Sequence, residues 1–156
     1  KYVARFASEF QALDSLKVAS ELDKRLQQEG RRLEVLIQVN SSDEDQKFGL
    51  PPQKVVDFAR QLKPFDALEV RGLMTLALFT DDTSRIAQCF TVMRQVQQEL
   101  RDATDQRWDE LSMGMSGDFE LAIEHGATCV RVGQAIFGNR LDPNAYWPGI
   151  KSNTNQ

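Results

Sequence analysis

Two periods of hydrophobic and polar residues alternate along this chain. Segments with an apolar residue every three to four positions predict helices at residues 16–29, 51–62, 83–103 and a shorter helix that ends at His125 and Gly126. Short apolar runs between them predict strands at residues 10–13, 32–40, 68–78, from Leu111 onward, and 127–132. Strands that alternate with helices in this way predict an α/β fold with a parallel sheet and right-handed crossovers.

Residues with capping chemistry stand at the predicted helix boundaries. Asp14 or Ser15 precedes the first helix and Gly30 follows it, which fits an N-cap and a glycine just past the last turn. Residues 81–83 offer capping oxygens to the long third helix. These boundaries fix where each strand must end.

In parallel α/β sheets, functional residues lie at the carboxyl ends of the strands. That rule selects the following positions: Asp14, Asn40, Met74 with Thr75, residues 112–116, and Arg131 with Gly133. All of them are expected at one edge of the sheet, because parallel strands end on the same side.

The last two predicted strands are each followed by a turn of small residues that opens a helix. The first turn contains Ser112, Gly114, Ser116 and Gly117, and the second contains Gly133. Turns of this kind present backbone N–H groups side by side, which suits a phosphate group. A purely structural interpretation also remains open, in which the first of these turns is only a tight turn with an N-cap.

Two charged residues of this stretch also have ordinary structural readings. Arg131 has Asp118 and Glu120 as ion-pair partners within a few residues of the neighbouring turn. His125, the only histidine of the chain, stands in the last turn of a predicted helix, where a cation favours the helix dipole. Neither residue identifies a reaction by itself.

Composition narrows the class of protein. With 156 residues and 41% apolar residues the chain is long enough for one domain with a real core. Its net charge is -4, and basic residues are interleaved with acidic ones, which argues against a nucleic-acid partner. The expected ligand is small, and the composition also permits an anionic one. Cys89 and Cys129 lie in apolar patterns and are expected to be reduced. No run is long enough to span a bilayer, so the expected location is the cytoplasm.

Five segments together resemble a known family. They are QALDS (11–15), VLIQVN (35–40), RGLMT (71–75), LSMGMSGD (111–118) and VRVGQAIFG (130–138), in that order along the chain. They are similar to the pyridoxal phosphate homeostasis proteins, the YggS/PROSC group. The pair of motifs at residues 112–116 and 130–138 is the most specific part of the resemblance.

The resemblance implies a TIM-barrel type (β/α)8 fold related to the alanine racemase N-terminal domain, with pyridoxal 5′-phosphate at the carboxyl ends of its strands. It implies a role in vitamin B6 and amino-acid homeostasis as a cofactor carrier or buffer, not as an enzyme. The positions that match cofactor-binding residues of the family are Asn40, Met74, Ser112, Gly114, Ser116, Arg131, Gly133 and Gln134. Among these, Arg131 matches the arginine that faces the pyridine nitrogen, and Ser112, Gly114 and Ser116 match the phosphate turn. No metal site is expected.

The chain also departs from the family pattern. The family's Schiff-base lysine lies in a VSKTK-like segment on the first barrel strand, and this sequence has no such segment. Five strands are predicted where a closed barrel of this class has eight. We therefore expect residues 1–142 to form the C-terminal portion of a barrel and residues 143–156 to form a partly disordered tail. The complete protein is expected to be monomeric, whereas this portion has open sheet edges through which it can associate.

Two alternative functions remain open at this stage. A pyridoxal phosphate-dependent racemase would need a lysine and an opposing acid or base at the barrel rim. Neither tyrosine, Tyr2 or Tyr146, stands at a strand end where it would act as a second base. The second alternative is a general phosphate-binding barrel fragment, such as part of an aldolase.

Overall fold

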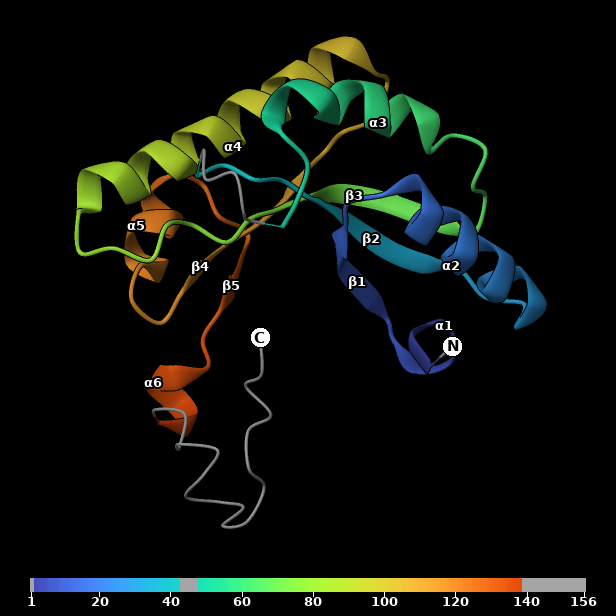
Figure 1. Cartoon of the computed structure of the whole chain (residues 1–156), viewed down its shortest axis with the longest axis horizontal. Helices are drawn as coiled ribbons and strands as arrows, with labels where there is room; N and C mark the ends of the chain where they lie inside the picture. The colour runs from blue at the N-terminus through green and yellow to red at the C-terminus, as the bar shows by residue number, and fades with distance from the viewer. Residues whose placement is uncertain (1, 43–47, 139–156) are drawn as a thin grey trace, which may run out of the picture.

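The structure is a computed structural model that describes residues 2–42 and 48–138 (Figure 1). Its elements in chain order are α1 (Tyr2–Phe6), β1 (Glu9–Leu13), α2 (Leu16–Gln28), β2 (Leu33–Gln38), the 3-10 helix η1 (Pro52–Lys54), α3 (Val55–Gln61), β3 (Leu68–Met74), α4 (Thr83–Ala103), β4 (Glu110–Met115), α5 (Phe119–Glu124), β5 (Cys129–Arg131) and α6 (Gln134–Phe137). The five strands form one sheet in the order β1-β2-β3-β4-β5, and every neighbouring pair is parallel. The predicted α/β alternation is confirmed.

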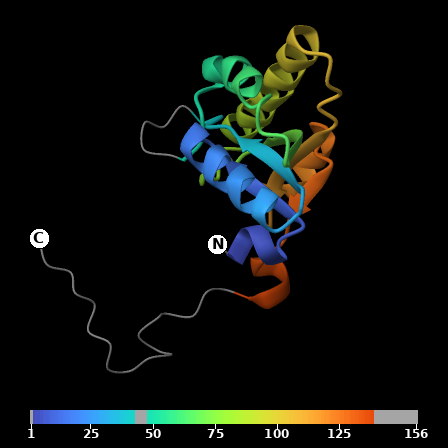
Figure 2. The same cartoon turned by 90° about the vertical axis from the view of Figure 1, so that its right-hand side faces the viewer.

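Helices cover one side of this sheet. Figure 1 shows α3 and α4 along one side, whereas the short helices α1 and α6 lie beyond the other side. Figure 2 shows the sheet curling beneath α2, α3 and α4. The arrangement is a curled half-barrel, with its outer face under the helices; none of the described helices covers its concave inner face.

Alternation along the strands separates the two faces. Leu33, Val35 and Ile37 of β2 point to the helices and belong to the hydrophobic core, together with Phe90 and Met93 of α4. Each of these side chains is almost fully buried, and a buried aliphatic or aromatic side chain contributes about 1.5–3 kcal/mol. The outer face therefore holds the sheet and its helices together.

Two of the predicted helix caps are confirmed. The Ser15 hydroxyl accepts a hydrogen bond from the Val18 N–H at 3.3 Å. The Asp82 carboxylate accepts hydrogen bonds from the Ser84 and Arg85 N–H groups at 3.0 and 3.3 Å. These bonds satisfy donors that have no partner inside the helix.

The third strand is shorter than predicted. The apolar run suggested a strand over residues 68–78, but β3 ends at Met74, which is the last β3 residue paired with β4. Thr75 still donates its N–H to the Ser112 carbonyl at 3.1 Å, and the chain then leaves the sheet toward α4. Hydrophobicity alone could not locate this end, because residues 76–78 are apolar without having a strand beside them.

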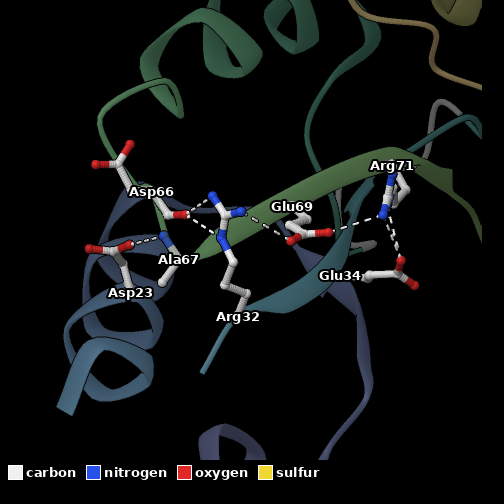
Figure 3. Close-up of polar contacts among 7 residues, drawn as sticks. All are labelled: Asp23, Arg32, Glu34, Asp66, Ala67, Glu69 and Arg71. Carbon is white, nitrogen blue, oxygen red and sulfur yellow. Dashed lines mark hydrogen bonds and ion pairs between the residues drawn. The ribbon is translucent and has the colours of Figure 1, made fainter. Parts of the chain in front are cut away.

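A network of polar contacts connects the amino ends of β2 and β3 (Figure 3). Arg71 contacts Glu34 at 2.9 Å and Glu69 at 3.0 Å on the sheet surface. In the same region the largely buried Asp23 of α2 accepts a hydrogen bond from the Ala67 N–H at 2.9 Å. These contacts lie at the end of the sheet opposite to the strand ends chosen for function, where residues stabilise the fold.

Two further observations concern the described residues only. Within residues 2–42 and 48–138, no helix is both long and apolar enough to cross a bilayer. Both cysteines are free thiols, although Cys129 is only partly buried. The tail expected at residues 143–156 lies outside the described residues, so the proposed division of the chain remains a prediction.

Candidate functional site

The predicted site residues lie along the carboxyl edge of β2 to β5. Their positions are as follows: Asn40 two residues after β2, Met74 at the end of β3, Ser112 and Gly114 inside β4, Ser116 directly after β4, Arg131 at the end of β5, Gly133 at the N-cap of α6 and Gln134 as its first residue. Since the strands are parallel, all of these positions lie at the same end of the strands, along one edge of the sheet.

Arg131 is the centre of this edge. Its Nη1 donates to the Ser112 hydroxyl at 2.5 Å and its Nη2 donates to the Thr75 carbonyl at 2.7 Å. The guanidinium therefore reaches from β5 over the ends of β4 and β3. Burial lowers the pKa of Arg131, and its neighbours Cys129 and Asp118 partly offset this effect. An arginine in this setting stays charged at neutral pH, because its ordinary pKa is so high.

The ion-pair interpretation of Arg131 is not what the structure shows. Among the described residues, the salt bridges do not include Arg131. The Asp118 carboxylate instead accepts a hydrogen bond from the Met115 N–H at 2.6 Å. Arg131 is thus oriented by a neutral hydroxyl and a neutral carbonyl, and no carboxylate in the described part of the chain contacts it.

Ser112 lies in a strand and not in a turn, which corrects the sequence-based prediction. β4 continues to Met115, because Met115 still pairs with Arg131 of β5, and the turn covers residues 116–118 only. The Ser112 side chain is fully buried. Its hydroxyl donates to Gln11 Oε1 at 2.6 Å while its oxygen accepts from Arg131. Ser112 therefore contacts the arginine and not the turn.

Gly114 also belongs to β4 and has a packing reason to be glycine. Its φ is +96°, and a Cβ at this position would lie 2.6 Å from Ala122 Cβ and 3.0 Å from Phe119 Cα. The absent side chain lets α5 approach β4 closely. As a result, the turn at residues 116–118 is held next to the start of α6.

Ser116 is the residue of this turn that faces α6. Its hydroxyl oxygen accepts a hydrogen bond from the Ala135 N–H at 3.2 Å. Gly133 precedes α6 as its N-cap, and Gln134 is exposed on its first turn. A side-chain hydroxyl and the backbone of a strand-to-helix turn are thus brought together, as the motif spacing predicted.

Met74 and Asn40 occupy two different places. Met74 is 7% exposed and pairs with Ser112 in the β3–β4 register, so it lies next to the arginine network. Asn40 lines a cavity of about 510 Å³ between the loop after β2 and α4, together with Ser41 and Arg85. The two places are connected through Thr75, whose hydroxyl is 2.8 Å from the Ser41 hydroxyl.

Two contacts of the site were not predicted as site residues. Thr75 was selected only as a strand end, yet its carbonyl is one of the two acceptors of Arg131. Gln11 lies on β1, on the far side of β2 and β3 in the sheet, and reaches Ser112 across the concave face. Gln11 is a polar side chain in the strand EFQAL and the first residue of the QALDS segment, but neither signal indicated its contact with Ser112.

The donor set suits an anionic ligand better than a metal ion. It offers a guanidinium, a hydroxyl and strand-to-helix backbone, all on one edge. Within the described parts of the chain, no three histidine, cysteine or acidic side chains converge in a way that would hold a metal ion.

Comparison with known proteins supplies the family context. The model of the alanine racemase N-terminal domain matches residues 4–141. The protein named pyridoxal phosphate homeostasis protein in Pasteurella multocida is 42% identical over 141 residues, which cover 90% of this chain and 60% of that protein. The chain thus spans about 60% of the length of this relative.

Solved structures agree in fold. The structure of PipY from Synechococcus elongatus with PLP bound matches with a TM-score of 0.79 and 31% identity, covering 87% of this chain and 63% of that one. Alanine racemase from Corynebacterium glutamicum matches with a TM-score of 0.63 and 16% identity over 85% of this chain and 36% of the other, which is a likeness of fold only.

Proposed function

Because the chain belongs to the alanine racemase N-terminal domain family, we propose that it binds pyridoxal 5′-phosphate at the carboxyl ends of β4 and β5. The bound cofactor would be held for storage and transfer in vitamin B6 and amino-acid homeostasis. The observation that carries this proposal is the arginine at the end of β5, which is fixed by Ser112 and Thr75 without a contacting carboxylate from residues 2–42 or 48–138. PLP is present in the related PipY structure.

The ring end of the cofactor would be held by Arg131. When bound, the cofactor supplies an aldehyde and a pyridine ring that serves as an electron sink. A guanidinium only donates hydrogen bonds, so it favours the unprotonated pyridine nitrogen and weakens that sink. Met74 lies beside the network and would flank the ring. This environment suits retention of the cofactor better than carbanion chemistry.

The phosphate end would be held by the turns after β4 and β5. Ser116 supplies a hydroxyl, and Gly133 and Gln134 supply backbone at the start of α6. Gly114 acts indirectly, because its missing side chain seats α5 and places the turn. Asn40 and Ser112 complete the proposed set, although Ser112 acts through Arg131 and Asn40 stands on the neighbouring loop.

We propose a carrier and not a catalyst. A racemase needs two acid–base groups on opposite faces of the substrate. The single histidine ends α5, and its Nδ1 is 2.8 Å from the Leu121 carbonyl. Tyr2 is exposed on α1, and Tyr146 lies outside the described residues. The partner of the protein would be this small cofactor, not nucleic acid or a membrane, and the cytoplasm is the proposed location, which agrees with the free thiols.

The test is a binding titration with pyridoxal 5′-phosphate followed by absorbance and equilibrium dialysis. Wild type should retain the cofactor, Arg131→Ala should bind it more weakly with a changed spectrum, and Arg131→Lys checks whether charge alone suffices. Arg60→Ala, an exposed arginine on α3, is the control. Equal affinity and spectra in wild type and both Arg131 variants would overturn the site. Racemisation of several amino acids above the rate with free cofactor would overturn the carrier.

A further inference from the structure

We propose that Gln11 is a positioning residue that orients Arg131 toward the bound cofactor by way of Ser112. This inference rests on the proposed function and deepens it, because it assigns a role at the site to a strand on the opposite side of the half-barrel. Three hydrogen bonds in series carry it, and they connect β1 with β5 across the concave face.

The series runs over a long distance in sequence. Arg131 Nη1 contacts the Ser112 oxygen at 2.5 Å, and the Ser112 hydroxyl contacts Gln11 Oε1 at 2.6 Å, although Gln11 and Ser112 are 101 residues apart. The Gln11 side-chain amide then donates to the Glu9 carboxylate. In the sheet, β2 and β3 separate β1 from β4, so this contact exists only because the sheet is curled.

The chemistry at the two ends fixes the direction of every bond in the series. A guanidinium can only donate, so the Ser112 oxygen must accept and its proton must point elsewhere. Gln11 Oε1 accepts the hydrogen bond that the Ser112 O–H donates. An ionised carboxylate can only accept, so the amide nitrogen of Gln11 must face Glu9. Each group therefore has one orientation that satisfies all of its partners.

Burial makes this orientation matter. Ser112 is fully buried, and so is Thr75, whose carbonyl accepts from Arg131 Nη2. The Thr75 hydroxyl in turn donates to the Val39 carbonyl at 2.8 Å. Arg131 thus donates two hydrogen bonds. One goes to the Ser112 hydroxyl, whose orientation depends on Gln11, and the other goes to the Thr75 backbone carbonyl. A guanidinium has five N–H donors, so donors remain for a ligand after these two bonds.

Replacing the Gln11 amide would remove a partner of the Ser112 hydroxyl, whereas it would affect Arg131 only indirectly. Without Gln11 Oε1, the Ser112 proton has no designated acceptor, and the hydroxyl can rotate so that it no longer offers its oxygen to Arg131. The guanidinium would then keep the Thr75 contact but lose its second one. We expect cofactor affinity to fall roughly 3- to 10-fold, which is less than the loss of a whole charge-assisted hydrogen bond, because the guanidinium keeps its Thr75 contact and stays in the site.

The first test needs no cofactor. In protein with ¹⁵N-labelled arginine, the Arg131 guanidinium should show slow rotation in its NMR spectrum, and Arg131→Lys identifies its signal. Gln11→Met and Ser112→Ala should each give fast rotation, and Ser112→Thr, which keeps the hydroxyl, should restore slow rotation. Gln61→Met, an exposed glutamine on α3, is the matched control. Slow rotation in a folded Gln11→Met variant would overturn the proposal.

The second test uses pyridoxal 5′-phosphate on the same proteins. Gln11→Met should shift the absorption spectrum of the bound cofactor in the same direction as Ser112→Ala, and the double variant should be no worse than either single one. Gln11→Asn keeps the amide but shortens its reach, and should behave like Gln11→Met. If the wild-type protein does not bind pyridoxal 5′-phosphate, the proposed function is refuted. The NMR spectrum of the Arg131 guanidinium would still decide the role of Gln11. If the losses of affinity in the Gln11 and Ser112 variants add up in the double variant, the two residues act independently and the proposal is wrong.

Discussion

Gly72 of β3 lies directly opposite Glu110 of β4, and a Cβ on Gly72 would stand only 1.9 Å from the Glu110 carbonyl oxygen. The two backbones approach one another here more closely than any side chain allows. Since β3 is the middle strand of the sheet, this contact sets the spacing on which the site above it depends.

Gly72→Ala should therefore destabilise the protein more than an alanine at Gly117 or Gly133, the other described glycines whose φ is not positive. We expect a loss of about 3 kcal/mol or more in the free energy of unfolding, because backbone must move to admit the methyl group. Urea unfolding measures it. Gly117→Ala is the control, since a Cβ there meets nothing within 4 Å. Equal unfolding midpoints for the two variants would contradict the prediction.

Asp23 should be the most important residue of the network in Figure 3. Its carboxylate is 8% exposed and accepts from the Ala67 N–H at 2.9 Å and from the Gln27 side chain at 2.8 Å. Asp23→Ala leaves a buried donor without its acceptor, which costs about 1–3 kcal/mol. Thermal or urea unfolding measures the loss.

Two comparisons make that result specific. Asp23→Asn keeps an acceptor oxygen and should lose less. Asp57→Ala removes an exposed carboxylate that pairs with Arg60 at 3.4 Å, and exposed pairs contribute little. The prediction fails if Asp57→Ala is as harmful as Asp23→Ala.

Glu110 should make stability depend on pH in the acidic range. Its pKa is raised above 4.5, first because of burial and then because of Glu9 and Glu34, while Arg71 acts in the opposite direction. At pH values just above 4.5, Glu110 therefore holds a proton more often in the folded state than in the unfolded state. Stability consequently falls as the pH rises through this window, and the penalty is complete above the folded-state pKa.

Glu110→Gln removes this penalty. The variant should gain stability over wild type at pH 7, and the gain should shrink as the pH is lowered through the window that begins at 4.5. Urea midpoints at several pH values measure this difference. Glu99→Gln, on an exposed position of α4, is the matched control. A gain that is the same at acidic and neutral pH would show that the Glu110 charge is not responsible.

The sequence predicted the sheet and its edge well, for a physical reason. Helix caps such as Ser15 and Asp82 and the periodic apolar positions are local features, so they can be recognised without knowing the neighbours. Parallel pairing then places every strand end on one side. Arg131 and Ser116 could be located in this way, because each directly follows or ends a strand.

The sequence could not reveal how these residues connect. Ser112 looked like part of a turn because serine and glycine favour turns, yet pairing with β5 extends β4 beyond it. Gln11 belongs to the QALDS segment, but its contact with Ser112 could not be predicted, because that contact depends on the curl of the whole sheet. Contacts across a concave face are set by tertiary structure, whereas sequence patterns report on local structure.

A substitution of Ser116 distinguishes the phosphate end of the proposed cofactor site from its ring end. The Ser116 hydroxyl lies in the turn after β4, and its oxygen accepts the Ala135 N–H at 3.2 Å. Because this hydroxyl has its own proton to donate, it would hold the phosphate while keeping its contact with α6. Ser116→Ala should weaken pyridoxal 5′-phosphate binding by about 1.5–3 kcal/mol, or roughly 10- to 150-fold.

Pyridoxal without its phosphate distinguishes this effect from general damage. Its affinity should be the same for Ser116→Ala and wild type, because ring contacts belong to Arg131. Arg131→Ala should weaken both ligands, since Arg131 holds the ring that they share. Ser84→Ala, an exposed serine on α4, should change neither affinity. Equal losses of both ligands in Ser116→Ala would mean that the hydroxyl supports the turn and does not contact the phosphate, and the phosphate would then have to be held by the backbone of α6 alone.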